Sequence, residues 1–403
     1  MALNLIHHYT IRFVKIRWLR KNLIMSVGIC TLMLFSVLLF AWNWTVQLNE
    51  NEDVSDLAES IQIFISVNGW RSIRQFIISM KSMLYYQNRV EAHNPQCILS
   101  LPNATIWPCP RDSKVKSDRP IQLYMLSYHS TKRILEEILR KWNLQRVRWQ
   151  FYPMEEYQYL IDWIPNTHHA GIFALGKLLL PRILPKSVKK VISIDVDTLY
   201  NHDIAELWDH FQLFNERQVL GYAWEQQSES PTCNDEKIGD LPIFGMNGGV
   251  ALMHLERMTE LGWDKLWISV LEDLLSELGQ LIEGEQQVIR TIIQKYPHIY
   301  YKLPCEWNVQ FYSDVASECC HVIWPLRYPD QIDCWANDRN AHSVRPVKIV
   351  HFDSLWKPDE MNRSVYLPDV STQIERRLTT EEIRNRFVQT FYGFADIPLH
   401  CFY

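Results

Sequence analysis

The chain has 403 residues, of which 47% are hydrophobic and 12% aromatic, so it can build one large core or two domains and is not of the intrinsically disordered class. Its formal net charge of −5 gives no electrostatic reason to expect a nucleic acid or an anionic surface as a partner. We find no long low-complexity tract and no convincing repeat period.

The N-terminal region predicts a membrane anchor at residues 22–42. "LIMSVGICTLMLFSVLLFAW" (Leu23 to Trp42) carries no formal charge and is long enough to cross the hydrocarbon core as a helix. Basic residues precede it and acidic residues follow it, which places residues 1–21 in the cytosol and the rest in the lumen. A cleaved signal peptide is the alternative, but the apolar run is long for one and lacks a clear small-residue cleavage site. We therefore expect a single-pass type II membrane protein with a polar stem at 43–59.

Cysteines and glycosylation sequons suit a lumenal chain. Eight of the nine cysteines, all but Cys30, lie beyond the predicted anchor, where disulfides can persist. Sequons begin at Asn43, Asn103 and Asn362, although Asn43 is close to the membrane.

Beyond the stem, strand and helix patterns alternate. Apolar runs predict strands, apolar residues at helical spacing predict helices, and together they imply a mostly parallel sheet covered on both faces. Such sheets bind ligands beyond the carboxyl ends of their strands. Residues 90–119 break the pattern, and we interpret them as a surface insertion that a Cys97–Cys109 disulfide could staple. The predicted strands are 61–66, 121–127, 147–152 and 189–195, and the predicted helices are 73–84, 131–142 and 170–184.

Asp195 and Asp197, in "SIDVDTLY", stand at one of these strand ends. About one Asp-x-Asp is expected by chance in a chain of this size and composition, so the motif alone favours a solvated loop. Its place between a buried strand and a helix beginning near Asp203 favours a site. Carboxylates suit Mg²⁺ or Mn²⁺, and such an ion beside a diphosphate would neutralise charge on the leaving group.

Three further stretches carry residue types that bind ligands. "MNGGVALMHL" places small residues just before a predicted strand, where they permit close approach to a ligand, and "GEQQVI" opens a helix. "KIVHFDSLWKP" ends a strand at His351, with Lys357 six residues later. A lone histidine is more often structural, but one at a strand end, followed by a lysine within reach of phosphate, favours binding.

These ordered stretches resemble family 8 of the retaining glycosyltransferases, and within it the xylosyltransferase domain of the LARGE-type xylosyl/glucuronyl transferases. The resemblance extends from about Ile61 to beyond Lys357 and is densest in "WIPNTHHAGIFALGKLLL", "VISIDVDTLYNHDIAELW", "MNGGV", "LPCEWNVQ" and "IVHF". It implies an α/β domain of the GT-A (Rossmann-like) type over residues 60–403, a UDP-sugar donor, Mn²⁺ and a Golgi location with the catalytic domain in the lumen.

The resemblance also implies residue roles. The metal ligands are Asp195, Asp197 and His351, and the residues expected to contact the donor are Lys177, Lys357, Asp195, Gly248 and Val67. Glu285, Gln286 and Asn247 are expected to be the catalytic residues, and with Gly248, Trp307 and Asn308 they would line the sugar and acceptor region. By the family pattern, Cys305 pairs with Cys320, or alternatively with Cys319.

The chain departs from the family at Glu285-Gln286-Gln287, where Asp-Gln-Asp is typical, and this alters the groups expected to orient the donor. LARGE proteins carry a second transferase domain, so we expect no repeating disaccharide polymer from this chain alone. We interpret it as a transferase that moves xylose from UDP-xylose to a glycan or glycoprotein, with retention of configuration. The alternatives are a UDP-glucose hexosyltransferase of the same fold and a catalytically silent, lectin-like or chaperone family member. A homodimer is compatible with each of these.

Overall fold

The computed structural model describes residues 60–101, 104–106, 119–226, 245–310, 320, 322–324, 345–353, 357–360 and 380–403. Residues Glu59–Tyr403 form one compact unit. The predicted anchor, the stem, the asparagines of the three sequons and Cys109 lie outside the described residues. Within those ranges, no helix combines the length and the apolar character that a membrane span requires.

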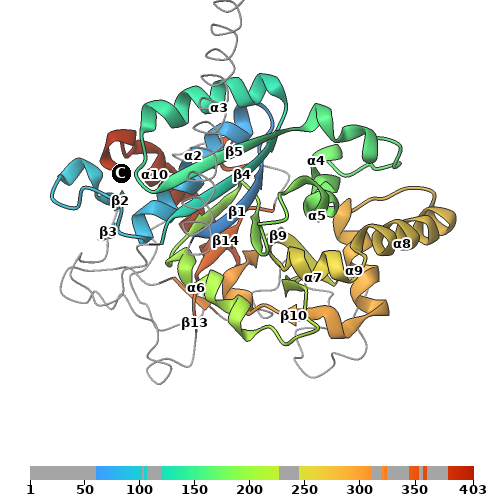
Figure 1. Ribbon diagram of the computed structural model, residues 1–403. Helices are drawn as coiled ribbons and strands as arrows, with labels where there is room; N and C mark the ends of the chain where they lie inside the picture. The colour runs from blue at the N-terminus through green and yellow to red at the C-terminus, as the bar shows by residue number, and fades with distance from the viewer. Residues whose placement is uncertain are drawn as a thin grey trace, which may run out of the picture. The chain divides into compact units, whose positions relative to one another are not determined.

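A seven-stranded sheet forms the centre of the domain (Figure 1), in the order β10-β8-β9-β6-β1-β4-β5. Neighbouring strands are parallel except at β9, which runs antiparallel to both β6 and β8. The prediction of a mostly parallel sheet is confirmed with this exception. The strands are β1 (Ile61–Ser66), β4 (Ile121–Ser127), β5 (Val147–Pro153), β6 (Val191–Ile194), β8 (Leu220–Trp224), β9 (Met246–Met253) and β10 (Tyr300–Lys302).

Alternate residues of the inner strands pack on opposite faces of this sheet. In β4, Ile121, Leu123 and Met125 join one core cluster, whereas Tyr124 and Leu126 join another. Successive side chains of a strand point to opposite faces, so a continuous apolar run makes both faces apolar and both must be covered.

Two sets of helices provide that cover (Figure 1). One face packs against α2 (Gly69–Tyr86), α3 (His129–Trp142), α6 (Ile204–Asp209) and α10 (Thr380–Asp396). The other packs against α4 (Ile172–Leu175), α5 (Leu180–Ile183), α7 (Leu255–Glu260), α8 (Trp263–Leu278) and α9 (Glu285–Lys295). The single helix predicted over 170–184 is divided into α4, a 3-10 turn and α5, because Pro181 has no amide hydrogen to continue an α-helical ladder.

Residues 90–101 are not a surface insertion. Cys97, Leu99 and Leu101 are buried in the first core cluster, beside a short hairpin of β2 (Leu99–Leu101) and β3 (Ala104–Ile106). Cys97 forms a disulfide with Cys401, so the predicted pairing with Cys109 is wrong. This stretch contains a proline and several polar residues, and its few apolar side chains pack against residues near the C-terminus. A local sequence pattern cannot predict such distant partners.

A second, three-stranded sheet brings the end of the chain back to the main sheet. It consists of β11 (Val309–Gln310), β14 (Ile349–His351) and β7 (Thr198–Tyr200), and a further pair is formed by β12 (Val322–Ile323) and β13 (Arg345–Pro346). β14 runs antiparallel to β7, with His351 opposite Thr198. The N–H of Phe352 donates to the carbonyl of Asp197 over 2.8 Å. The ends of β6 and β14 are thereby held side by side.

Candidate active site and metal centre

A cavity of about 890 Å³ opens where the carboxyl ends of β1, β6 and β8 meet. Its walls include Ser66 and Asn68 after β1, Asp195 and Asp197 after β6, and Glu225 after β8. The strand-end location of the site, predicted from the alternating pattern, agrees with this position.

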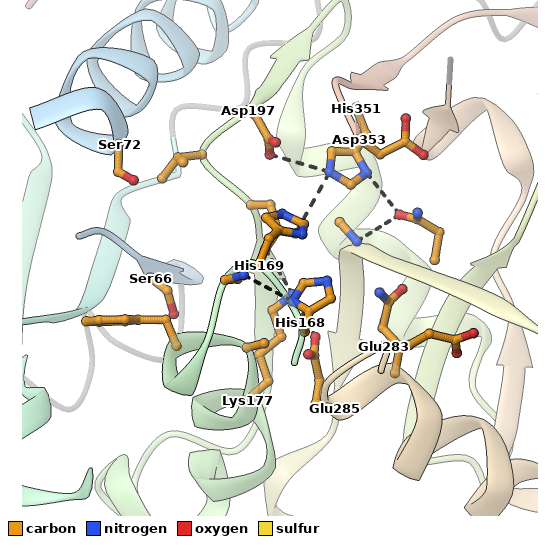
Figure 2. A pocket seen from close by; sticks show the side chains of 18 of the residues that line it. Ser66, Ser72, His168, His169, Lys177, Asp197, Glu283, Glu285, His351 and Asp353 are labelled. Atoms are coloured by element: carbon orange, nitrogen blue, oxygen red, sulfur yellow. Dashed lines mark hydrogen bonds and ion pairs between the residues drawn. The ribbon is translucent and has the colours of Figure 1, made fainter. Parts of the chain in front are cut away.

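Three potential metal ligands meet on the wall of the cavity. One ligand atom each from Asp195, Asp197 and His351 lies within 4.8 Å of the other two. The Nε2 atom of His351 is 3.4 Å from Oδ1 of Asp197 and 3.9 Å from Oδ2 of Asp195. The side chains of Asp197 and His351 are buried, whereas that of Asp195 is 34% exposed and gives the group an open side. Figure 2 shows the imidazole of His351 beside the Asp197 carboxylate.

Hydrogen bonds determine which nitrogen of His351 faces the carboxylates. The N–H of Gly249 donates to Oδ1 of Asn247 over 2.9 Å, so this atom of the amide is an acceptor. His351 Nδ1 lies 2.9 Å from the same oxygen and must therefore carry hydrogen and donate it. This leaves Nε2 as the nitrogen turned towards Asp195 and Asp197. Histidine ligands are commonly oriented by such a bond to the other ring nitrogen, so these residues fit a divalent metal ion.

The close approach of His351 to β9 requires glycine at position 249. A Cβ atom there would lie 2.2 Å from His351 Nδ1, well inside any real contact. The expected close approach of a ligand to the small residues of "MNGGV" stays a prediction, and at position 249 the close neighbour is the His351 ring. These residues lie within β9 and not before it.

Lys177 is buried and holds two carboxylates together. Its Nζ is 2.9 Å from Oδ1 of Asp195 and 3.2 Å from Oε1 of Glu285, and it donates to the carbonyl of Gly248 over 2.9 Å. An ammonium group has three N–H bonds, and these acceptors use all of them, so Lys177 bridges the two carboxylates. Its contact with a diphosphate stays a prediction. Burial alone would lower the pKa of Lys177, but the two carboxylates raise it above its ordinary value.

Lys357 neutralises the other aspartate. Its Nζ donates to Oδ2 of Asp197 over 2.5 Å and to the carbonyl of Phe352 over 2.9 Å, and its side chain lines the cavity. Burial alone would raise the pKa of Asp197, but Lys357 and His351 hold it well below its ordinary value. Burial alone would lower the pKa of His351, but the Asp197 carboxylate beside the ring raises it above its ordinary value. A bound cation would displace the proton that the carboxylate otherwise favours on this ring.

The departure at 285–287 has a structural explanation. Glu285 and Gln286 line the cavity, and Gln286 Oε1 accepts the N–H of Gly248 over 2.6 Å. Gln287 is buried behind them, where its Oε1 accepts the N–H of Ile282 over 3.0 Å. An amide oxygen accepts that bond as a carboxylate would, so Gln287 removes no charged group from the cavity. Burial raises the pKa of Glu285, and Lys177 opposes the increase.

Four residues expected to contact ligands form bonds or contacts within the protein, and their contact with a ligand stays a prediction. Val67 is fully buried and its N–H donates to the carbonyl of Leu126. Both backbone polar groups of Gly248 bond within the protein. Trp307 is fully buried, donates to Nε2 of His210 and packs under Lys348. Asn308, also fully buried, bonds to Asn247. The predicted disulfide of Cys305 with Cys320 is confirmed, and it closes the turn that carries Trp307 and Asn308.

Several cavity residues were missed by sequence reasoning. His168 and His169 lie side by side, 4.2 Å between ring centroids, opposite the metal ligands (Figure 2). Burial, with His169 beside it, lowers the pKa of His168 to about 4, so its ring is neutral near pH 7. Glu225, Glu283 and Asp353 form an acidic wall on the other side. Glu225 directly follows β8, so the strand-end argument that selected Asp195 could have found it.

Comparison with known proteins gives consistent matches. The profile of Glycosyl transferase family 8 matches residues 78–359. Xylosyl- and glucuronyltransferase LARGE2 of Mus musculus is 31% identical over 274 residues, covering 66% of this chain and 34% of that protein. Xylosyl- and glucuronyltransferase LARGE1 of Homo sapiens is 28% identical over 323 residues, covering 78% and 35%. The chain thus spans about a third of the length of these relatives.

Solved structures also align with the chain. Mouse xyloside xylosyltransferase 1 aligns with a TM-score of 0.49 and 17% identity, covering 73% of this chain and 98% of that one. The galactosyltransferase LgtC aligns with a TM-score of 0.46 and 14% identity, covering 82% and 95%.

Proposed function

This chain belongs to glycosyl transferase family 8, and we propose that it is a metal-dependent enzyme that transfers a sugar from a nucleoside-diphosphate sugar to a glycan or glycoprotein, with retention of configuration. The observation that carries the proposal is the meeting of Asp195, Asp197 and His351 on the wall of the large cavity. Membership of the family supplies the reaction class, and the donor atoms supply a place for the ion that such a reaction uses.

A divalent ion held by these ligands would stabilise negative charge on the diphosphate leaving group. Two carboxylates and one imidazole suit Mn²⁺ better than Mg²⁺, which prefers oxygen ligands throughout. The chain's own residues prepare the site. Lys177 holds Asp195 and Glu285 in fixed positions, and Lys357 places a second positive charge beside Asp197.

We propose xylose as the transferred sugar. The named activities of the relatives are xylosyl and glucuronyl transfer, and the acidic wall favours the first. Asp353 and Glu283, the latter paired with Arg290 over 2.6 Å, would disfavour the carboxylate of a glucuronate, whereas xylose carries no charge. Burial and the nearby Asp353 raise the pKa of Glu225 to about 8, so this carboxyl is mostly protonated near pH 7 and adds little charge to the wall.

We also propose that the catalytic unit works in the Golgi lumen. This proposal rests on the uncharged run at 22–42 and the distribution of charge around it.

The test is a donor panel with the full-length protein. UDP-xylose, UDP-glucose, UDP-galactose and UDP-glucuronate are supplied separately with Mn²⁺, and released UDP is measured. We expect xylose to react fastest and glucuronate slowest. Faster turnover of either hexose would overturn the donor assignment. No turnover of any donor, together with no Mn²⁺-dependent binding of UDP, would overturn the enzyme assignment in favour of a silent family member.

A matched pair of variants tests the acidic wall. Glu283→Gln is expected to raise the rate with UDP-glucuronate relative to UDP-xylose, because it removes one negative charge from the cavity. Glu277→Gln removes a charge from the exposed surface of α8 and should leave the ratio unchanged. An equal ratio in both variants would mean that the wall does not select the donor.

A further inference from the structure

Behind the metal centre lies a network of buried side-chain amides. Its members are Asn247, Asn308, Gln226 and Gln310, none more than 5% exposed. Asn308 Nδ2 is 2.9 Å from Oδ1 of Asn247 and 3.3 Å from its carbonyl oxygen. The carbonyl of Asn308 accepts hydrogen bonds from Nε2 of Gln226 and of Gln310. The two glutamines therefore fix the backbone of Asn308, and its side chain in turn donates to Asn247.

The orientation of these amides follows from neighbouring backbone groups that can act only as hydrogen-bond donors or only as acceptors. The N–H of Gly249 can only donate, so Oδ1 of Asn247 faces it. Both Asn247 atoms next to Asn308 are then oxygens, so Asn308 must present its Nδ2 to them. The remaining oxygen of Asn308 is buried without a hydrogen-bond partner among the described residues. A buried, unpartnered oxygen is destabilising, so its retention needs an explanation.

We propose that Asn308 is a positioning residue for the metal centre. By donating to Oδ1 of Asn247, it keeps that oxygen available as the acceptor for His351 Nδ1, and so keeps Nε2 of His351 turned to the metal ligands Asp195 and Asp197. The inference rests on the proposed function in taking these three residues as the metal site. Asn308 itself is fully buried and does not line the cavity.

The substitution Asn308→Asp isolates this effect, because it keeps the shape of the side chain and removes the N–H. The new carboxylate cannot donate to Oδ1 of Asn247. The Asn247 amide is therefore expected to rotate and donate from Nδ2 to the carboxylate, giving up the bond from the Gly249 N–H, because a charge-assisted hydrogen bond is the stronger of the two. His351 Nδ1 then faces a donor, accepts from it, and leaves the hydrogen on Nε2, where it blocks coordination. Loss of such outer partners typically weakens metal binding about 10- to 100-fold, and we expect an effect of that size on Mn²⁺.

The experiment measures Mn²⁺ binding to the full-length protein by electron paramagnetic resonance. The signal of free Mn²⁺ gives the affinity, and ¹⁴N coupling in a pulsed experiment reports an imidazole on the bound ion. His351→Gln must lose this coupling, which assigns it to His351. Asn201→Asp is the matched control, because Asn201 is also buried and its Nδ2 donates to a backbone carbonyl, that of Val347, over 2.8 Å.

We expect Asn308→Asp to lose both affinity and ¹⁴N coupling, and Asn201→Asp to lose stability alone. Unchanged coupling in folded Asn308→Asp would overturn the positioning role while leaving the metal site intact. An equal loss of Mn²⁺ affinity and ¹⁴N coupling in Asn201→Asp would also overturn the positioning role, since any buried aspartate would then produce the effect. Wild-type protein without His351-dependent ¹⁴N coupling would overturn the metal centre itself. If circular dichroism shows that Asn308→Asp is unfolded, Asn308→Ser is measured in its place, because serine adds no charge. Unchanged Mn²⁺ affinity in Asn308→Ser would reject the inference.

Discussion

Replacing Gly249 by alanine should remove His351 from the metal centre. A Cβ atom at 249 would lie 2.2 Å from Nδ1, 2.4 Å from Cε1 and 2.6 Å from Cγ of His351, whereas ordinary contact begins at 3.4 Å. The ring must therefore move by about 1.2 Å, the difference between 3.4 Å and 2.2 Å, or β9 must move instead. Metal–ligand distances tolerate only about 0.2 Å. We expect Mn²⁺-dependent binding of UDP to weaken by about 10- to 100-fold or more.

Calorimetry of UDP binding with and without Mn²⁺, beside thermal unfolding, separates this effect from general overpacking. An extra methyl in a packed core typically costs about 1–3 kcal/mol of unfolding free energy. Gly221→Ala is the control, because its Cβ would lie 3.0 Å from Phe214 and 3.1 Å from Leu252, away from the metal ligands. It should lower stability and leave the Mn²⁺ dependence unchanged. Undiminished Mn²⁺-dependent binding in Gly249→Ala would refute the steric argument.

Three other predictions concern the metal, the disulfides and pH. Asp197→Ala should abolish Mn²⁺-dependent UDP binding, measured by calorimetry, and unchanged binding would contradict the ligand assignment. Replacing both cysteines of a disulfide by serine should lower the free energy of unfolding, measured with denaturant, by about 6 kcal/mol for Cys97–Cys401 and about 3 kcal/mol for Cys305–Cys320, whose sequence separations are 304 and 15. A reversed order would contradict the loop-entropy argument. Burial lowers the folded-state pKa of His210 to about 4, below its ordinary value of 6.5. The native state therefore binds fewer protons than the unfolded state between these values, and stability should fall as pH drops from 6.5 to 4. In thermal melts across this pH range, His210→Gln should reduce the dependence of stability on pH. An unchanged dependence would mean that other groups cause it.

Much of the fold could be predicted because local patterns carry it. The runs at β1 and β4 are mostly apolar on both faces of the strand, a pattern typical of a sheet that is buried on both faces. Asp195 and Asp197 follow β6 at the edge where parallel strands end together, so their place could be inferred from order along the chain alone. The role of His351 as their partner in metal binding follows from the family resemblance. Its register opposite Thr198 depends on a second sheet that no periodicity in the sequence predicts.

The tertiary structure decided the rest, and the reason is physical in each case. Lys177 and Lys357 are alike in sequence, but Lys177 bridges Asp195 and Glu285, whereas Lys357 pairs with Asp197. Cys97 pairs with Cys401 because buried apolar packing, not sequence proximity, brings the two ends of the domain together. The tautomer of His351 depends on a backbone N–H of β9 and an amide from the turn at Asn308, which are distant in sequence and meet only when the sheets have formed. Residue types and strand ends can be read along the chain, whereas which donor meets which acceptor is settled only by folding.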